Sequence, residues 1–246
     1  RLDESVFGHV VGTVLRSPPR LPLEERAIGP TYVTLIPEVE AMFSWAHMLH
    51  RQLYDIIADR RLTPNARDDR IRELLAYYRS RPDLAFSSTP KAMALMEGQA
   101  YSLTFRRASP KYNGLLWSYH WLQMATYDAL LADDDPVARR RAVDGAVARF
   151  WMLVSDAPAR MPRVMPMAAA VAPRFADRYP DAAIIFDNLH ALHDVVADVL
   201  SSPHLSASER RRILLVAAAA YRDSTTAVTS REEWRAMSRG MGIERM

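Results

Sequence analysis

Residues 43–57, FSWAHMLHRQLYDII, carry a short pattern that returns at residues 186–200 as FDNLHALHDVVADVL. Both copies hold a His-x-x-His pair, with a phenylalanine four positions before it and an aspartate five positions after it. Histidine is scarce, with 7 residues among 246, so two matching pairs stand out from the composition. A spacing of three residues on a helix places both imidazoles of a pair on one face, one turn apart.

Each copy also has the apolar spacing of an amphipathic helix. On a helical wheel, His50 falls inside the apolar face of its segment and His47 lies at the margin. In the second segment His193 flanks the apolar face, and His190 falls further toward the polar side. We therefore expect each helix to offer one histidine near the core and one nearer the rim, with the two helices facing each other across a shared interior.

The rest of the chain predicts further helices joined by short connections. Proline follows Thr63, Thr89 and Asp135, which is typical of a helix that begins with an N-cap residue and a proline. We expect one helix from about residue 88 to about residue 106, and a central one, apolar nearly all round, from about residue 112 to about residue 132. No segment has the period-two alternation of a strand. The predicted fold is all-α, a single bundle of about eight to nine helices.

The N-terminal segment is expected to differ from the bundle. Residues 17–22, SPPRLP, cannot form a regular helix. We therefore expect residues 1–30 to form an extended N-terminal strap and residues 31–246 to form one helical domain, with no Gly/Ser-rich linker dividing it.

Composition excludes several classes of protein. A 49% hydrophobic and 25% charged chain is typical of a folded globular protein. The formal net charge of +3 does not predict a nucleic-acid partner, and aromatic residues are not interleaved with basic ones. Because cysteine is absent, disulfides, thiolate metal sites and covalent c-type haem are excluded. No apolar run of about 18 residues predicts a transmembrane segment in this chain.

The cations are almost all arginine, and only Lys91 and Lys111 are lysine. This bias, together with many alanines, is typical of a GC-rich bacterial genome. The chain begins with Arg1 rather than methionine and has no cysteine, so we expect a bacterial protein exported to the periplasm, although the sequence leaves the compartment open. Arginine triplets at residues 139–141 and 210–212 are compatible with an acidic protein partner or a membrane surface.

The histidine pairs predict a metal site. Imidazole is the commonest protein metal ligand, and helical bundles build such sites from histidines and carboxylates on facing helices. With no thiolate available, this donor set favours Fe, Mn, Cu or Zn. The doublet His193-Asp194 also resembles that of helical metal-dependent phosphohydrolases, in those two residues alone, and we carry no function over from it. The candidate ligands are His47, His50, His190, His193, Glu40, Glu97, Asp187 and His120.

Three functions remain open at this point. The first is a helical-bundle metalloprotein, either a dinuclear oxidoreductase or a metal-dependent hydrolase. The second is a non-enzymatic subunit or adaptor of a larger, membrane-associated complex, which the lack of a complete catalytic motif favours. The third is a bundle that holds a non-covalent haem between His50 and His193. Under the second interpretation the imidazoles only pack in the interior and bond to backbone carbonyls.

Overall fold

The computed structural model describes residues 2–18 and 29–241. Within these ranges the chain forms helices and no strand, so the predicted all-α bundle is confirmed. The longer helices are α1 (Leu2–His9), α4 (Pro37–Ala58), α5 (Pro64–Arg79), α8 (Pro110–Leu130), α9 (Pro136–Ser155), α12 (Pro180–Ser201), α13 (Ala207–Arg222) and α14 (Arg231–Ser238). The shorter elements are the π-helix η1 (Val10–Val14), α3 (Pro30–Leu35), α6 (Ala94–Glu97), α7 (Thr104–Ala108), α10 (Ala168–Val171) and α11 (Pro173–Arg178).

Side-chain caps begin several helices where the sequence places them. Thr63 before α5 and Asp135 before α9 each accept the backbone N–H three residues further on, at 3.2 and 2.8 Å. Ser206 before α13 and Ser230 before α14 each form a capping box with the glutamate three residues later. These local bonds satisfy the first N–H groups of the helices and fix their boundaries.

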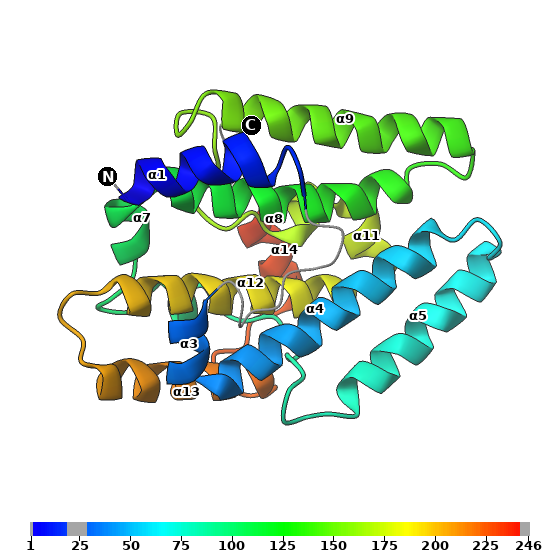
Figure 1. Cartoon of the computed structure of the whole chain (residues 1–246). Coiled ribbons are helices and arrows are strands. Elements are labelled where there is room, and N and C mark those ends of the chain that lie inside the picture. The colour runs from blue at the N-terminus through cyan, green and yellow to red at the C-terminus, as the bar shows by residue number, and fades with distance from the viewer. Residues whose placement is uncertain (1, 19–28, 242–246) are drawn as a thin grey trace.

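Helix α12 lies at the centre of the bundle, with α8 on one side, α13 on the other and α4 crossing it (Figure 1). Of its 22 residues 16 are buried, so it has no continuous face toward solvent. Helix α8, which the sequence predicts to be central, buries 10 of its 21 residues and lies between α12 and the outer helices α9 and α1 (Figure 1). Among the described residues, no helix has both the length and the apolar character needed to cross a membrane.

Buried polar side chains of α12 hold the loop segments around it. Asn188 donates to the carbonyls of Ser87 and Thr89 at 2.8 and 3.0 Å. Asp198 accepts the N–H groups of Leu103 and Phe105 at 2.7 and 2.8 Å. A buried amide or carboxylate is tolerated only when such bonds replace its bonds to water. The irregular backbone between α5 and α8 therefore supplies the hydrogen-bond partners of these two buried side chains of α12.

The prediction of one continuous helix from about residue 88 to about residue 106 is wrong. This segment forms the short helices α6 and α7, separated by turns, and Lys91 pairs with Val228 in an isolated antiparallel bridge. Hydrogen bonds between its backbone and side chains of α12 take the place of the backbone hydrogen bonds of a regular helix. Tertiary contacts therefore outweigh the local helix propensity of this segment.

The extended conformation expected for the N-terminal strap is wrong for residues 2–14, which form α1 and η1. Asp3 in α1 accepts two N–H groups in the first turn of α8 at 3.2 and 2.8 Å. Apolar side chains of α1 and η1 pack against α8 and α9. Packing that the local sequence does not reveal therefore makes this segment helical. Most of the proline-containing part of the predicted strap lies in residues 19–28, outside the described residues.

Trp234 anchors α14 to α12. Its side chain is 1% exposed, and its Nε1–H donates to Asp187 Oδ2 at 2.7 Å. The other carboxyl oxygen accepts the N–H of Ala168 at 2.8 Å. Burial raises the pKa of Asp187 to about 7, and these two hydrogen bonds act in the opposite direction. The carboxyl group thus connects three elements, α10, α12 and α14.

Replacing Trp234 by phenylalanine should lower the free energy of unfolding by about 2–4 kcal/mol, because it leaves a buried carboxyl oxygen without its donor and opens space in the core. Urea denaturation followed by circular dichroism measures this loss. The matched control is Trp151→Phe at a half-buried position in α9, which should cost less than about 1 kcal/mol. If the loss in Trp234→Phe is no larger than in the control, this anchoring role is wrong.

Candidate functional site

The two copies of the repeated pattern lie in α4 and α12, which cross each other (Figure 1). Their histidines lie close together between the two helices. The first histidine of each copy faces the second histidine of the other. The ring centroids of His47 and His193 are 5.8 Å apart, and those of His50 and His190 are 6.1 Å apart. The predicted meeting of the two histidine pairs across a shared interior is therefore present in the fold.

The phenylalanine of each copy also packs against a histidine of the other copy. Phe43 packs against His193 with centroids 4.1 Å apart, and Phe186 stacks on His50 at 3.6 Å. The contacts are thus reciprocal: a position in one copy makes the same contact with the other copy as its equivalent position does in return. This is the contact pattern of two helices related by a local, approximate two-fold axis. The sequence repeat corresponds to a repeat in space.

His120 of α8 joins these rings from a third helix. Its centroid lies 4.3 Å from that of His190 and 5.2 Å from that of His193. Five of the sequence-predicted ligands therefore gather between α4, α8 and α12. We call this set the imidazole cluster: His47, His50, His120, His190 and His193.

Hydrogen bonds fix the protons of two of these rings. His120 Nδ1 lies 2.7 Å from the carbonyl of Leu116, so Nδ1 carries the proton and Nε2 keeps a lone pair. That Nε2 lies 3.2 Å from His193 Nδ1, which therefore donates to it. This assignment holds for the neutral form of both rings, which burial favours.

Tyr127 of α8 fixes a third ring. Its hydroxyl donates its one proton to the backbone carbonyl of His50 at 2.9 Å. His50 Nδ1 lies 2.9 Å from the same hydroxyl oxygen and is therefore the donor to it. His50 Nε2 then carries a lone pair, which has no hydrogen-bond partner among the described residues. Both ring nitrogens of His190 are likewise without a partner in that part of the chain.

Burial keeps these imidazoles neutral. It lowers the pKa of His50, His190 and His193 well below the ordinary value and that of His120 to about 4. Repulsion from neighbouring imidazoles lowers the pKa of each further, whereas the bond to Leu116 raises that of His120. At neutral pH His50, His120, His190 and His193 are therefore uncharged Lewis bases.

The prediction of which α12 histidine is more deeply buried is wrong. His190, which the helical wheel places toward the polar side, is 0% exposed, and His193 is the half-buried one. The wheel assumes that a helix has a solvent face, and α12 has none.

The three candidate carboxylates bond to groups outside the imidazole cluster. Glu40 accepts the hydroxyl proton of Ser44 at 3.1 Å, and Glu97 pairs with Arg106 at 3.0 Å. Asp187 is held by the backbone N–H of Ala168 and the ring N–H of Trp234, as described above. Within the described residues, no three His, Asp or Glu side chains form a group already arranged to hold a metal ion.

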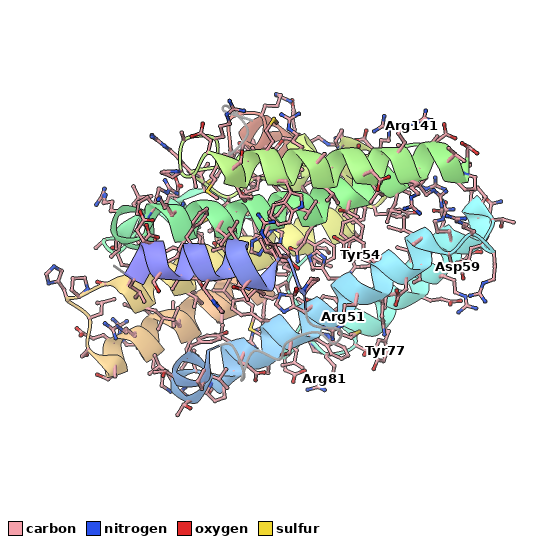
Figure 2. All side chains as sticks on the ribbon, turned by 45° about the horizontal axis from the view of Figure 1, so that its top comes forward. Arg51, Tyr54, Asp59, Tyr77, Arg81 and Arg141 are labelled. Atoms are coloured by element: carbon pink, nitrogen blue, oxygen red, sulfur yellow. The ribbon has the colours of Figure 1, made fainter. Side chains whose placement is uncertain are left out.

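Tyr127 is the functional residue that the sequence interpretation missed. It follows His120 by seven residues, two turns along the same face of α8, and this spacing is the signal that predicts their proximity. Tyr54 of α4 stacks on it with centroids 4.1 Å apart and donates to the carbonyl of Gln123 at 2.6 Å. Figure 2 shows Tyr54 on the side of α4 that faces α8.

The arginine triplets do not form one uniform basic surface. Arg139 is 7% exposed and bonds to the carbonyl of Asp133, and Arg211 pairs with Glu38 at 2.6 Å. Arg141 extends from the outer face of α9 (Figure 2). Part of this charge is therefore used within the fold, and an acidic protein partner stays a prediction.

No protein-family model matches the chain, and neither does any curated protein or solved structure. The function must therefore be inferred from the site itself.

Acidification should destabilise the metal-free protein. The unfolded chain binds protons on histidine below about pH 6.5, whereas the folded cluster resists protonation until a lower pH. The free energy of unfolding should therefore fall as the pH drops from about 6.5 toward 4, by up to about 1.4 kcal/mol per pH unit for each buried histidine. Asp187 and Asp194, with pKa values raised to about 7, act in the opposite direction over this window and offset part of the loss.

Urea denaturation at several pH values, in the presence of a chelator, measures this dependence. His190→Gln should lose less stability than the wild type on acidification, because one buried site no longer resists protonation. His204→Gln, at an exposed position between α12 and α13, is the control and should behave like the wild type. Identical pH dependence in all three proteins would refute the buried neutral cluster.

Proposed function

We propose that this chain is a metalloprotein whose imidazole cluster binds a transition-metal ion between α4, α8 and α12. The observation that carries the proposal is the set of unpartnered ring nitrogens, His50 Nε2 and both nitrogens of His190, in the described part of the interior. A buried polar atom without a partner costs about 1–3 kcal/mol, so several in one place need an explanation such as a missing ion. A bound cation would provide a partner for the lone pairs among them, one on His50 and one on the neutral ring of His190.

The orientation of two rings supports this proposal. His120 gives its Nδ1–H to the Leu116 carbonyl, and His50 gives its Nδ1–H to the Tyr127 hydroxyl, which leaves both Nε2 atoms as Lewis bases. Metal-binding histidines are typically oriented in this way, with the second nitrogen bonded to a carbonyl, a carboxylate or a similar group. Tyr127 and the Leu116 carbonyl would act as positioning groups.

The spacing of nitrogens is also compatible with one ion. Two imidazole nitrogens that bind a tetrahedral metal with bonds of about 2.0–2.1 Å lie about 3.3–3.4 Å apart. His120 Nε2 and His193 Nδ1 are 3.2 Å apart. An ion would take the place of the proton between them, which would move to Nε2 of His193, and the ring of His190 would turn to supply a third nitrogen. This rearrangement is required because the present arrangement is not yet a coordination shell.

The donors favour copper or zinc among the expected metals. Imidazole suits Cu, Zn, Fe and Ni, whereas Mn prefers carboxylate and water oxygens, and affinities of divalent ions rise to a maximum at copper. The candidate carboxylates bond elsewhere, so the ligand set would be neutral. A metal-dependent hydrolase would need a base beside the metal-bound water, and the same carboxylates are engaged. Hydrolysis therefore has less support, and the oxidoreductase interpretation applies with copper, because zinc has no redox chemistry.

The other two interpretations have less support. A haem between α4 and α12 would have to displace Phe43 and Phe186, whose rings pack directly on His193 and His50. A purely structural subunit leaves the unpartnered nitrogens of His190 without a role.

Addition of Cu²⁺ or Zn²⁺ to the chelator-treated protein should therefore yield a stoichiometric complex. Elemental analysis after gel filtration measures the bound metal, and thermal unfolding measures the stabilisation, which is about 2.7 kcal/mol at a free metal concentration 100 times Kd. His190→Gln and His120→Gln should each weaken binding by about tenfold or more.

The matched control is His204→Gln, which should bind as the wild type does, and circular dichroism checks that each variant is folded. Wild-type protein that retains no metal at all, or a His190→Gln variant with unchanged affinity, would rule out the imidazole cluster as the site.

A further inference from the structure

A small cavity lies on the face of α12 that carries Asp187 and Ala191, apart from the imidazole cluster. Its volume is about 20 Å³, enough for one water-sized occupant. Twelve residues line it, and four of them are methionine, whereas 12 methionines in 246 residues predict fewer than one in such a set. The methionines are Met93, Met96, Met165 and Met167.

Two separate segments supply these side chains. Met93-x-x-Met96 lies at α6, and Met165-x-Met167 lies in the loop before α10. Met96 and Met165 are each 2% exposed and Met167 is 4% exposed, so three of the four sulfur-bearing side chains are in the interior. Methionine commonly fills irregular gaps in a core. Here four of them line one cavity.

Thioethers select one kind of occupant. They are neutral and polarisable, and together with thiolates they are the protein ligands that favour Cu(I) over harder ions. The cost of burying an ion rises with the square of its charge, so a monovalent ion costs about a quarter as much as a divalent one of the same size. An interior lined with neutral sulfur ligands is therefore best suited to a soft monovalent cation.

Charged groups on the wall are compatible with such an ion. The Lys91 ammonium is turned to the carbonyls of Asp223 and Thr226 at 2.8 and 2.9 Å and to the Asp223 carboxylate at 3.4 Å, so its charge is compensated there. Asp187 lies on the same wall, where its two carboxyl oxygens accept hydrogen bonds from Ala168 and Trp234.

We propose that this cavity is a binding site for a soft monovalent metal ion, Cu(I), held by the thioethers of Met93, Met96, Met165 and Met167. The site does not depend on metal at the imidazole cluster, because the two sites share no side chain. They are neighbours along α12, since Ala191 of the cavity wall follows His190 directly in the chain.

Ag⁺, which has the charge and softness of Cu(I) without its redox chemistry, is the first probe. Calorimetric titration of the full chain should show a saturable site. In ¹³C-methyl-methionine NMR spectra, four of the twelve methionine methyl signals should shift more than the rest on Ag⁺ addition. The double variant Met165→Leu/Met167→Leu should lose affinity by about tenfold or more. Anaerobic competition with a chromogenic Cu(I) chelator should rank the affinities of the wild type and the variant for Cu(I) in the same order.

Leucine conserves the volume of methionine, and such apolar swaps are the best tolerated in a core, so the variant should fold. Met93→Leu/Met96→Leu is a second, independent test from the other segment. The matched control is Met42→Leu/Met124→Leu, at buried positions outside the cavity wall, which should keep wild-type affinity. His190→Gln should also keep Ag⁺ at the cavity, even where it removes metal from the imidazole cluster. Unchanged Ag⁺ affinity in both cavity variants, or loss of the methionine shifts in His190→Gln, would overturn the proposal.

Discussion

A helix that is buried on every side must find an internal partner for each polar side chain it carries, and α12 is such a helix. Asn188 and Asp198 meet this requirement through the backbone of the segment between α5 and α8, and Asp187 meets it through α10 and Trp234 of α14. These bonds arrange the irregular parts of the chain around α12. His190 does not meet this requirement, since neither of its nitrogens has a partner among the described residues.

The same constraint explains the character of the proposed metal site. Burial between three helices keeps His50, His120 and His190 neutral, and hydrogen bonds to Leu116 and Tyr127 leave lone pairs at His120 and His50. Burial therefore has two effects. It leaves ring nitrogens without a hydrogen-bond partner, which costs stability, and it keeps their lone pairs available to bind a cation. The methionine-lined cavity on another part of α12 differs in ligand chemistry, because thioethers replace imidazoles there.

Much of the architecture follows from local signals in the sequence. The caps at Thr63 and Asp135 predict helix starts, and the repeated histidine pattern predicts that α4 and α12 meet. The burial of His190 is not predictable in this way, because a helical wheel assigns every helix a solvent face. The broken segment around α6 and α7, the helical N-terminus and the partners of the carboxylates depend on contacts between residues distant in sequence, which periodicity does not contain.

Long-range ¹H–¹⁵N NMR of the histidine rings in the metal-free protein tests the central claim most directly, because it reports which nitrogen of each ring carries a proton. At neutral pH the account predicts that His50, His120 and His193 are neutral and protonated at Nδ1, with Nε2 unprotonated, and that His190 is also neutral. Imidazolium signals from these residues, or protons on Nε2 of His50 and His120, would contradict a buried cluster of available lone pairs.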